Sequence, residues 1–114
     1  MDRPQIEQIK ELVRGGTTPC VSIYLPYYPS GKETEQNAIQ LKNALHKAEK
    51  LLSERMRRGD VTALLKPGFD VLEDEKNATY SGKGLAMYLN GDAATVWRLP
   101  VRFNPLVVDG SRFH

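Results

Sequence analysis

The chain is poor in the residues from which most nucleophilic and metal sites are built. It contains one cysteine, Cys20, and two histidines, His46 and His114. A single cysteine excludes a disulfide within the chain, and the shortage of cysteine and histidine argues against a structural zinc site. Neither histidine has an evident serine or cysteine partner in the sequence, so we expect no nucleophilic triad. Cys20 stands among apolar residues and is predicted to be a small buried side chain.

Long apolar runs are also missing. No stretch approaches the roughly 20 apolar residues that a membrane helix needs, and residues 1–5 are polar, unlike the start of a signal peptide. The sequence therefore predicts a cytoplasmic protein with no membrane partner. Disorder is not indicated, because 40% of the residues are hydrophobic and 26% are charged, as in an ordinary globular protein. A length of 114 residues suits a single domain over residues 1–114.

Charge is distributed unevenly, although the formal net charge is only +2. Residues 42–58 are strongly basic, whereas Asp70, Glu73, Asp74 and Glu75 form an acidic cluster. The net charge is too small to indicate nucleic-acid binding by the surface as a whole. Two solvated helix faces of opposite sign are the commoner interpretation of such a pattern, and a binding surface is the alternative.

A helical pattern over residues 35–58, without an internal proline or glycine, organises the chain. Its apolar residues recur at spacings of three and four, the period of one helix face. They are Ala38, Leu41, Leu45, Ala48 and Leu52. Thr34 is a candidate cap at the start of this helix, and Gly59 is its predicted stop. The preceding residues 20–25 are typical of a buried strand, which Pro26 ends.

Two more helical regions are predicted. A short helix over residues 3–14 is capped by Asp2 and ended by Gly15-Gly16. Asp60 can cap a further helical region that extends to residue 74. Because Pro67-Gly68 interrupts its periodicity, this region is either one kinked helix or two short helices.

The last third of the chain changes to a period of two. Residues 85–89 and 93–99 are predicted strands joined at Asn90-Gly91, a strong hairpin signal, and residues 106–108 form a last strand. The element order is α-β-α-α-β-β-β. Because consecutive strands can pair as a meander, we predict an α/β (α+β two-layer) fold. In it, a mostly antiparallel sheet of about four strands is packed by helices.

Few residues qualify for catalysis. Gly82-Lys83-Gly84 is too short for a phosphate loop and precedes a predicted strand, so a turn is the better interpretation. The acidic residues 73–75 are sequential, which scatters them around a helix end and argues against an acid/base pair. We therefore expect no enzymatic activity, no metal and no cofactor in this domain.

The basic side of the helix over residues 35–58 is the remaining candidate site. It is either a solvated face above a buried apolar stripe or a surface that neutralises the phosphates of RNA. Tyr27 and Tyr28 in the adjoining loop could stack on exposed bases, although tyrosines after a strand more often serve packing. The predicted nucleic-acid-binding residues are Tyr27, Tyr28, Lys32, Asn37, Lys42, Lys47, Lys50 and Arg55.

Four segments together resemble a known family. They are Val21-Ser-Ile-Tyr-Leu-Pro26, Ile39-Gln-Leu-Lys-Asn-Ala-Leu45 followed by Ala48-Glu49, Gly84-Leu-Ala-Met-Tyr-Leu89, and Asp109-Gly-Ser-Arg-Phe-His114. In this order they are similar to the N-terminal domain of the bacterial and archaeal branch of the archaeo-eukaryotic class-1 peptide-chain release factors. The resemblance covers nearly the whole chain and implies a domain excised from a longer multidomain protein.

The resemblance implies a role at the ribosome, with ribosomal RNA or tRNA and further domains of the same protein as partners. The peptide-releasing Gly-Gly-Gln motif of release factors belongs to their middle domain, and here Gly15-Gly-Thr17 is typical of a helix end. Where the decoding motif Asn-Ile-Lys-Ser would fall, this chain has Asn37-Ala-Ile-Gln40, and only the asparagine matches. These departures argue against peptidyl-tRNA hydrolysis and stop-codon reading by this domain.

The predicted function is therefore that of a non-catalytic domain that contacts RNA or the ribosome within a release-factor-like, translation-associated protein. The alternative from another class is a protein–protein adaptor without nucleic-acid binding. In that alternative, the acidic residues 70–75 or the edge of the hairpin would dock a partner or a sister copy. The natural ligand and the oligomeric state stay open.

Overall fold

The structure is a computed structural model that describes residues 19–54, 56–77 and 80–109. Its elements are β1 (Val21–Pro26), the 3-10 turn η1 (Lys32–Thr34), α2 (Glu35–Ser53), α3 (Arg58–Asn77), β2 (Gly84–Leu89), β3 (Ala94–Leu99) and β4 (Leu106–Asp109). From β1 onward this order confirms the predicted α+β class. The predicted first helix with its cap and glycine end, Arg55, and residues 110–114 lie outside the described residues.

The four strands form one antiparallel sheet in the order β3-β2-β1-β4. The predicted hairpin is confirmed: Leu89 pairs with Ala94 across the turn. Asn90 Oδ1 accepts the backbone N–H groups of Asp92 at 3.0 Å and Ala93 at 3.1 Å, while Gly91 adopts a φ of 94°. Only a residue without Cβ takes that left-handed conformation freely. The turn therefore depends on glycine at position 91 for its backbone conformation and on the Asn90 side chain for its hydrogen bonds.

The predicted meander is wrong in one connection. The last strand, β4, does not continue beside β3 but pairs with β1, with Tyr24 opposite Leu106. The chain must therefore cross the end of the sheet between β3 and β4. Gly84 makes this crossing feasible, because a Cβ at this position would lie 2.0 Å from the carbonyl oxygen of Val101. Phe103 then packs edge-on against Tyr24, with ring centroids 5.5 Å apart.

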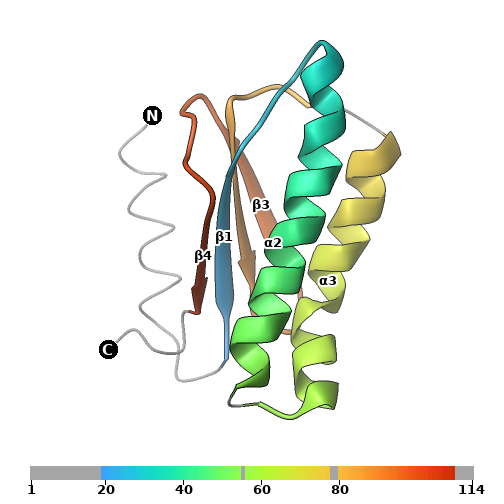
Figure 1. Ribbon diagram of the computed structural model, residues 1–114, viewed down its shortest axis with the longest axis vertical. Helices are drawn as coiled ribbons and strands as arrows, with labels where there is room; N and C mark the ends of the chain where they lie inside the picture. Colours follow the sequence, from blue (N-terminus) through green and yellow to red (C-terminus); the bar gives the residue numbers. More distant parts are fainter. Residues whose placement is uncertain (1–18, 55, 78–79, 110–114) are drawn as a thin grey trace.

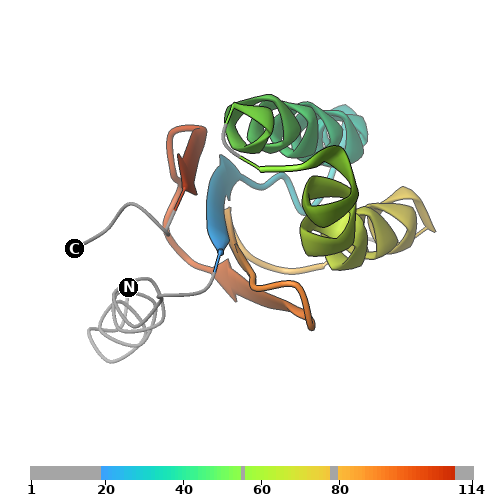
Figure 2. The ribbon, with the colours of Figure 1, turned by 90° about the horizontal axis from the view of Figure 1, so that it is seen from below.

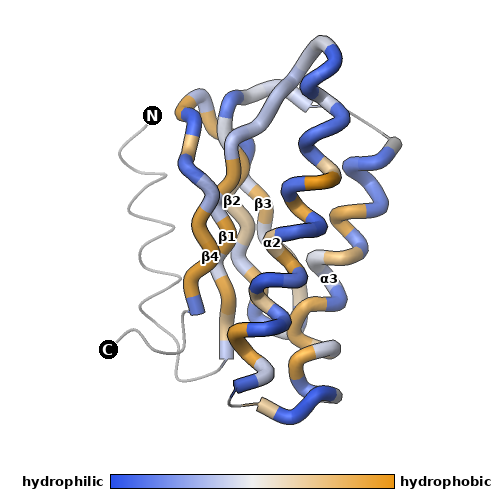
Figure 3. Tube along the Cα trace, in the orientation of Figure 1, coloured by the Kyte–Doolittle hydropathy of each residue, from blue (hydrophilic) through white to orange (hydrophobic). Residues whose placement is uncertain are grey.

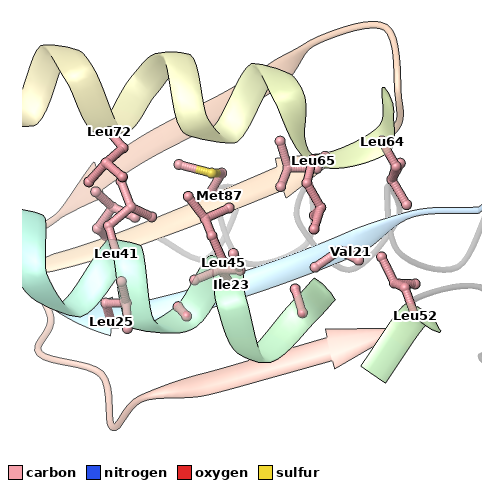
Figure 4. Packing of buried hydrophobic residues seen from close by; sticks show 14 of the residues in the cluster. Val21, Ile23, Leu25, Leu41, Leu45, Leu52, Leu64, Leu65, Leu72 and Met87 are labelled. Atoms are coloured by element: carbon pink, nitrogen blue, oxygen red, sulfur yellow. The ribbon is translucent and has the colours of Figure 1, made fainter. Parts of the chain in front are cut away.

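Both described helices cover the same face of the sheet (Figures 1 and 2). The predicted stripe of α2 is confirmed, since Leu41, Leu45 and Leu52 are at most 1% exposed. In Figure 4 the leucines of α2 and α3 meet Ile23 and Met87 of the sheet. Figure 3 shows hydrophobic and hydrophilic segments alternating along both helices, as expected for elements with one dry and one wet face.

The boundary between the helices differs from the prediction. Helix α2 ends at Ser53, and Gly59 lies in the first turn of α3 rather than stopping α2. The chain reverses between the two helices so that α3 can pack beside α2, and this tertiary requirement ends α2 before its helical pattern does. Thr34 is also not a side-chain cap: its hydroxyl donates to the carbonyl of Gly31 at 2.9 Å within the η1 turn.

The region around Pro67 is one continuous helix of 20 residues. Gly68, next to Pro67, is the point of closest approach between the helices. A Cβ at Gly68 would lie 2.7 Å from Leu45 Cδ2 and 3.1 Å from Leu89 Cδ1. Because α3 is held against both α2 and the sheet here, packing outweighs the missing backbone N–H of proline.

The second face of the sheet carries a smaller apolar cluster. Tyr24, Trp97 and Phe103 gather around the buried residues Ala86 and Leu99. Cys20 is buried, as predicted, and clusters with Tyr88. The sheet thus has apolar side chains on both faces. Among the described elements, however, helices pack on only one of these faces.

Candidate nucleic-acid interface

The predicted basic face of α2 is exposed to solvent. Lys42, Lys47 and Lys50 are all exposed, as is Lys32 in η1. Within the part of the chain that the structure describes, none of these four lysines forms an ion pair. They stay outward because the leucine stripe on the opposite side anchors the helix to the sheet. Four exposed, uncompensated ammonium groups can therefore meet an external anion without first breaking an internal pair.

The lysines do not form a single cluster. At about 100° per residue, Lys47 and Lys50 project about 60° apart around the helix axis, whereas Lys42 is about 140° from Lys47. Lys32 precedes the helix and lies at least about 18 Å from Lys47 along the axis, at 1.5 Å per residue. Lys47 and Lys50 thus make the compact centre of the face, and Lys32 and Lys42 extend it towards the helix start. Arg55, predicted with them, lies outside the described residues.

Asn37 is a structural residue, which corrects its predicted role. It is 5% exposed, although the sequence pattern placed it at the start of a solvent-facing helix. Its Oδ1 accepts the backbone N–H of Tyr28 at 2.9 Å, and its Nδ2 donates to the Tyr28 carbonyl at 2.7 Å. Both ends of the amide are therefore used in fastening the loop after β1 to the first turn of α2. Because the side chain is also buried, the amide is not accessible to a base.

Tyr27 is likewise wrong as a base-stacking residue, because it is 1% exposed. Its hydroxyl donates to Glu75 Oε2 at 3.2 Å and accepts the backbone N–H of Tyr80 at 2.9 Å. Burial raises the pKa of this hydroxyl further above neutral, so the hydroxyl stays a donor over a wider alkaline range. The packing interpretation of Tyr27 is the correct one.

Tyr28 is the member of the tyrosine pair that stays available. It is partly exposed, and the Arg102 guanidinium carbon lies 4.9 Å from the centroid of its ring. This cation–π pair joins the loop after β1 to the segment that crosses towards β4. Sequence reasoning missed Arg102, since 74 positions separate the two residues and no local pattern links them. Aromatic rings combined with arginine are a common surface for unpaired bases.

A buried charge network was also missed. The carboxylate of Glu75, at the end of α3, is 1% exposed and forms an ion pair with Arg98 of β3. The guanidinium carbon of Arg98 lies 3.8 Å from the centroid of the Tyr80 ring and 5.7 Å from that of Tyr27. Arg98 is thereby enclosed by two aromatic rings and one carboxylate. This arrangement ties α3 to the sheet and leaves Glu75 no access to solvent.

The predicted acidic cluster is compensated internally. Asp70 pairs with Lys66 at 3.4 Å, and Glu73 pairs with Lys76 at 3.1 Å, both on the surface of α3. Glu75 is buried against Arg98, so Asp74 is the only member of the cluster without an ion pair among the described residues. Residues 70–75 therefore do not present the continuous acidic patch that a basic partner would need.

The described residues contain no group of three or more histidine, cysteine, aspartate or glutamate side chains placed to hold a metal ion. None of their helices has the length and hydrophobicity that crossing a membrane requires. The chain matches no protein-family model, and no curated protein matches it either. The geometry defines a two-layer α+β domain in which an exposed lysine face on α2 lies opposite a well-packed core.

Proposed function

We propose that this protein is a non-catalytic, RNA-contacting domain that uses the exposed side of α2 at the ribosome, within a release-factor-like, translation-associated protein. The observation that carries the proposal is the absence of internal ion pairs at Lys32, Lys42, Lys47 and Lys50 within the described residues. Lysine side chains in this state neutralise phosphates and release condensed counterions, which drives binding to RNA.

Two further features support the proposal. Tyr28 and Arg102 add an aromatic and a cationic group near the N-terminal end of the same helix, where single-stranded bases could stack. The similarity of four sequence segments to the N-terminal domain of release factors supports ribosomal RNA or tRNA as the RNA that is bound. The cytoplasm is then the compartment in which we place the protein, because translation takes place there.

Stop-codon reading is not part of the proposal. Of the four residues where the decoding motif would fall, only Asn37 matches, and its amide is engaged with the backbone of Tyr28. The adaptor alternative through residues 70–75 is also weakened, because the carboxylates of Asp70, Glu73 and Glu75 pair with residues of the same chain. What stays is contact with the RNA backbone, which needs charge and not a specific motif.

The test is a salt titration with a fluorescein-labelled hairpin of ribosomal RNA and the full chain. Lys47→Glu combined with Lys50→Glu should weaken binding about tenfold or more, since two favourable phosphate contacts become repulsive. In the corresponding double alanine variant, the slope of log K against log salt should fall by about one for each lysine removed.

The matched control is Lys66→Glu combined with Lys76→Glu, which makes the same charge change on α3. These lysines are paired with Asp70 and Glu73, so their reversal should alter RNA binding about twofold at most. Equal weakening by both double variants would show that overall charge, and not the α2 face, governs binding. Unchanged binding in the α2 variant would refute the assignment outright.

A further inference from the structure

Among the described strands, β4 lies at one edge of the sheet. It pairs with β1 on one side only, and no described strand pairs with its other side. Every second residue of an edge strand turns its N–H and C=O groups outward, where another extended chain can bind them. The strand is short, at four residues, and its first residue, Leu106, is 50% exposed.

Apolar hollows flank this edge on both faces of the sheet. On the helix side, an edge groove of about 230 Å³ is floored by Leu25, Ala44 and Val107, between α2 and β4. On the other side, an aromatic hollow of about 450 Å³ is lined by Tyr24 and Phe103. The two hollows share Pro105 and Leu106. An added strand projects alternate side chains to opposite faces of a sheet, so it would fill both hollows at once.

The edge groove carries two polar groups that select its occupant. The Gln40 amide nitrogen is buried and has no hydrogen-bond partner within the part of the chain that is described. A carboxylate that an added strand projects to the helix side of the sheet would be an acceptor for this donor. Lys47 stands at the same groove and forms no ion pair among the described residues. A side chain with an apolar stem and a carboxylate head, such as glutamate, matches the floor and the rim together.

A second copy of this chain fits the edge less well. Antiparallel pairing of two β4 strands about a twofold axis would place both α2 helices on the same face of the joined sheet. The two Lys47 side chains, each on the β4 side of its helix, would then face one another across the axis. Like charges in that position oppose association, whereas an acidic peptide is attracted by each of them.

A small molecule fits less well too, because it would occupy one hollow and leave the strand edge unpaired, whereas an extended segment uses both hollows and the edge together. We propose that β4 binds an extended segment of a partner protein in which apolar residues alternate with acidic ones. The apolar side chains enter the aromatic hollow, and the acidic ones lie along the edge groove with their carboxylates at Lys47. The peptide site does not rest on the proposed RNA contact, but the two surfaces share Lys47, so an acidic peptide and RNA would compete for it.

The probe is a fluorescein-labelled hexapeptide of alternating valine and glutamate, measured by anisotropy against the full chain. Two peptides serve as comparisons: one with the same composition but with the three valines preceding the three glutamates, and one with lysine in place of glutamate. The alternating acidic peptide should bind about tenfold more tightly than either, because only it presents each side chain to its matching hollow. Amide NMR signals of residues 106–108 should shift on its addition.

The protein offers a matched pair of variants. Leu106 and Ile39 are 50% and 49% exposed, yet only Leu106 lines the two hollows. Leu106→Asp should weaken the alternating peptide about tenfold or more, and Ile39→Asp about twofold at most, since charge at the hollow excludes its apolar side chain. Thermal unfolding of both variants checks that the fold is retained.

Four results would overturn the proposal. Equal binding of the block peptide would reduce the effect to general charge attraction, and no binding at millimolar peptide would remove it. Equal weakening by the two variants would place the peptide elsewhere. Dimerisation that Leu106→Asp abolishes would identify a second copy as the occupant of the edge. Lys50→Glu alone should weaken RNA binding and leave the peptide affinity within about twofold, which separates a failure of the peptide site from a failure of the RNA contact.

Discussion

The two helices of this domain are similar in length and lie side by side, but they treat their surface charges differently. Helix α2 has 19 residues and α3 has 20. On α3, Lys66 and Lys76 each pair with a carboxylate one turn away, and Glu75 is buried against Arg98. On α2, Lys42, Lys47 and Lys50 form no ion pair within the described chain, while His46 lies 3.9 Å from Glu49.

This difference separates a structural helix from a candidate interaction helix. Charged side chains that form ion pairs within the protein help to hold the fold together, and they must break those pairs before they can bind a partner. Charges without internal partners contribute little to folding and keep their full capacity for external anions. The number of charged residues on a helix is therefore less informative than how they are paired, and pairing depends on the tertiary structure wherever the partners come from different elements.

The largest expected effect comes from the buried pair on α3. Glu75→Ala should lower the free energy of unfolding by about 3 kcal/mol, because it leaves the largely enclosed Arg98 guanidinium without its carboxylate and the buried Tyr27 hydroxyl without its acceptor. Asp70→Ala on the same helix should cost at most about 0.5 kcal/mol, since the pair it removes is exposed. Urea denaturation measures both. A loss below about 1 kcal/mol for Glu75→Ala would mean that Arg98 finds another partner or solvent.

Two glycines of α3 test how closely this helix is held to α2. Gly68→Ala would bring a Cβ to within 2.7 Å of Leu45 Cδ2, whereas Gly59 has no atom within 4 Å of such a Cβ. Both substitutions gain helix propensity, so their difference isolates packing. We expect Gly68→Ala to be less stable than Gly59→Ala by about 1–3 kcal/mol. Equal stabilities would show that Leu45 and Leu89 move aside without cost.

The smallest expected effect distinguishes paired from unpaired lysines directly. Lys66→Ala should lower the free energy of unfolding by about 0.3–0.5 kcal/mol more than Lys47→Ala, because only the former removes an i,i+4 ion pair. The difference should disappear in 1 M salt, where the Debye length is only about 3 Å. Chemical denaturation with and without salt is the measurement. A larger loss for Lys47→Ala would reveal that this lysine has an internal role.

Local signals in the sequence were sufficient for much of the fold. The spacing of Leu41, Leu45 and Leu52 predicted the buried face of α2, and Asn90-Gly91 predicted the hairpin. Both features depend on residues that are close together in the chain. The predictions that were wrong depended on distant contacts. Gly59 was predicted to end the long helix, but it lies in the first turn of α3, because α2 ends earlier where the chain turns back to place α3 beside it. At Pro67 the sequence left one kinked helix or two short helices open, and the packing of α3 against α2 and the sheet decides for a single helix. The same applies to β4, whose place beside β1 follows from a crossing that Gly84 permits.

The candidate site, too, was predictable from the sequence only where it depends on residues close together in the chain. The sequence by itself determined that lysines gather on the outer side of a long helix, since helical period and composition are local properties. Only the tertiary structure decided that Asn37 and Tyr27 are enclosed, that Tyr28 meets Arg102, and that Glu75 is reserved for Arg98. The physical reason is that burial and charge pairing depend on which residues the fold brings within a few ångströms, and separation along the chain does not reveal that distance.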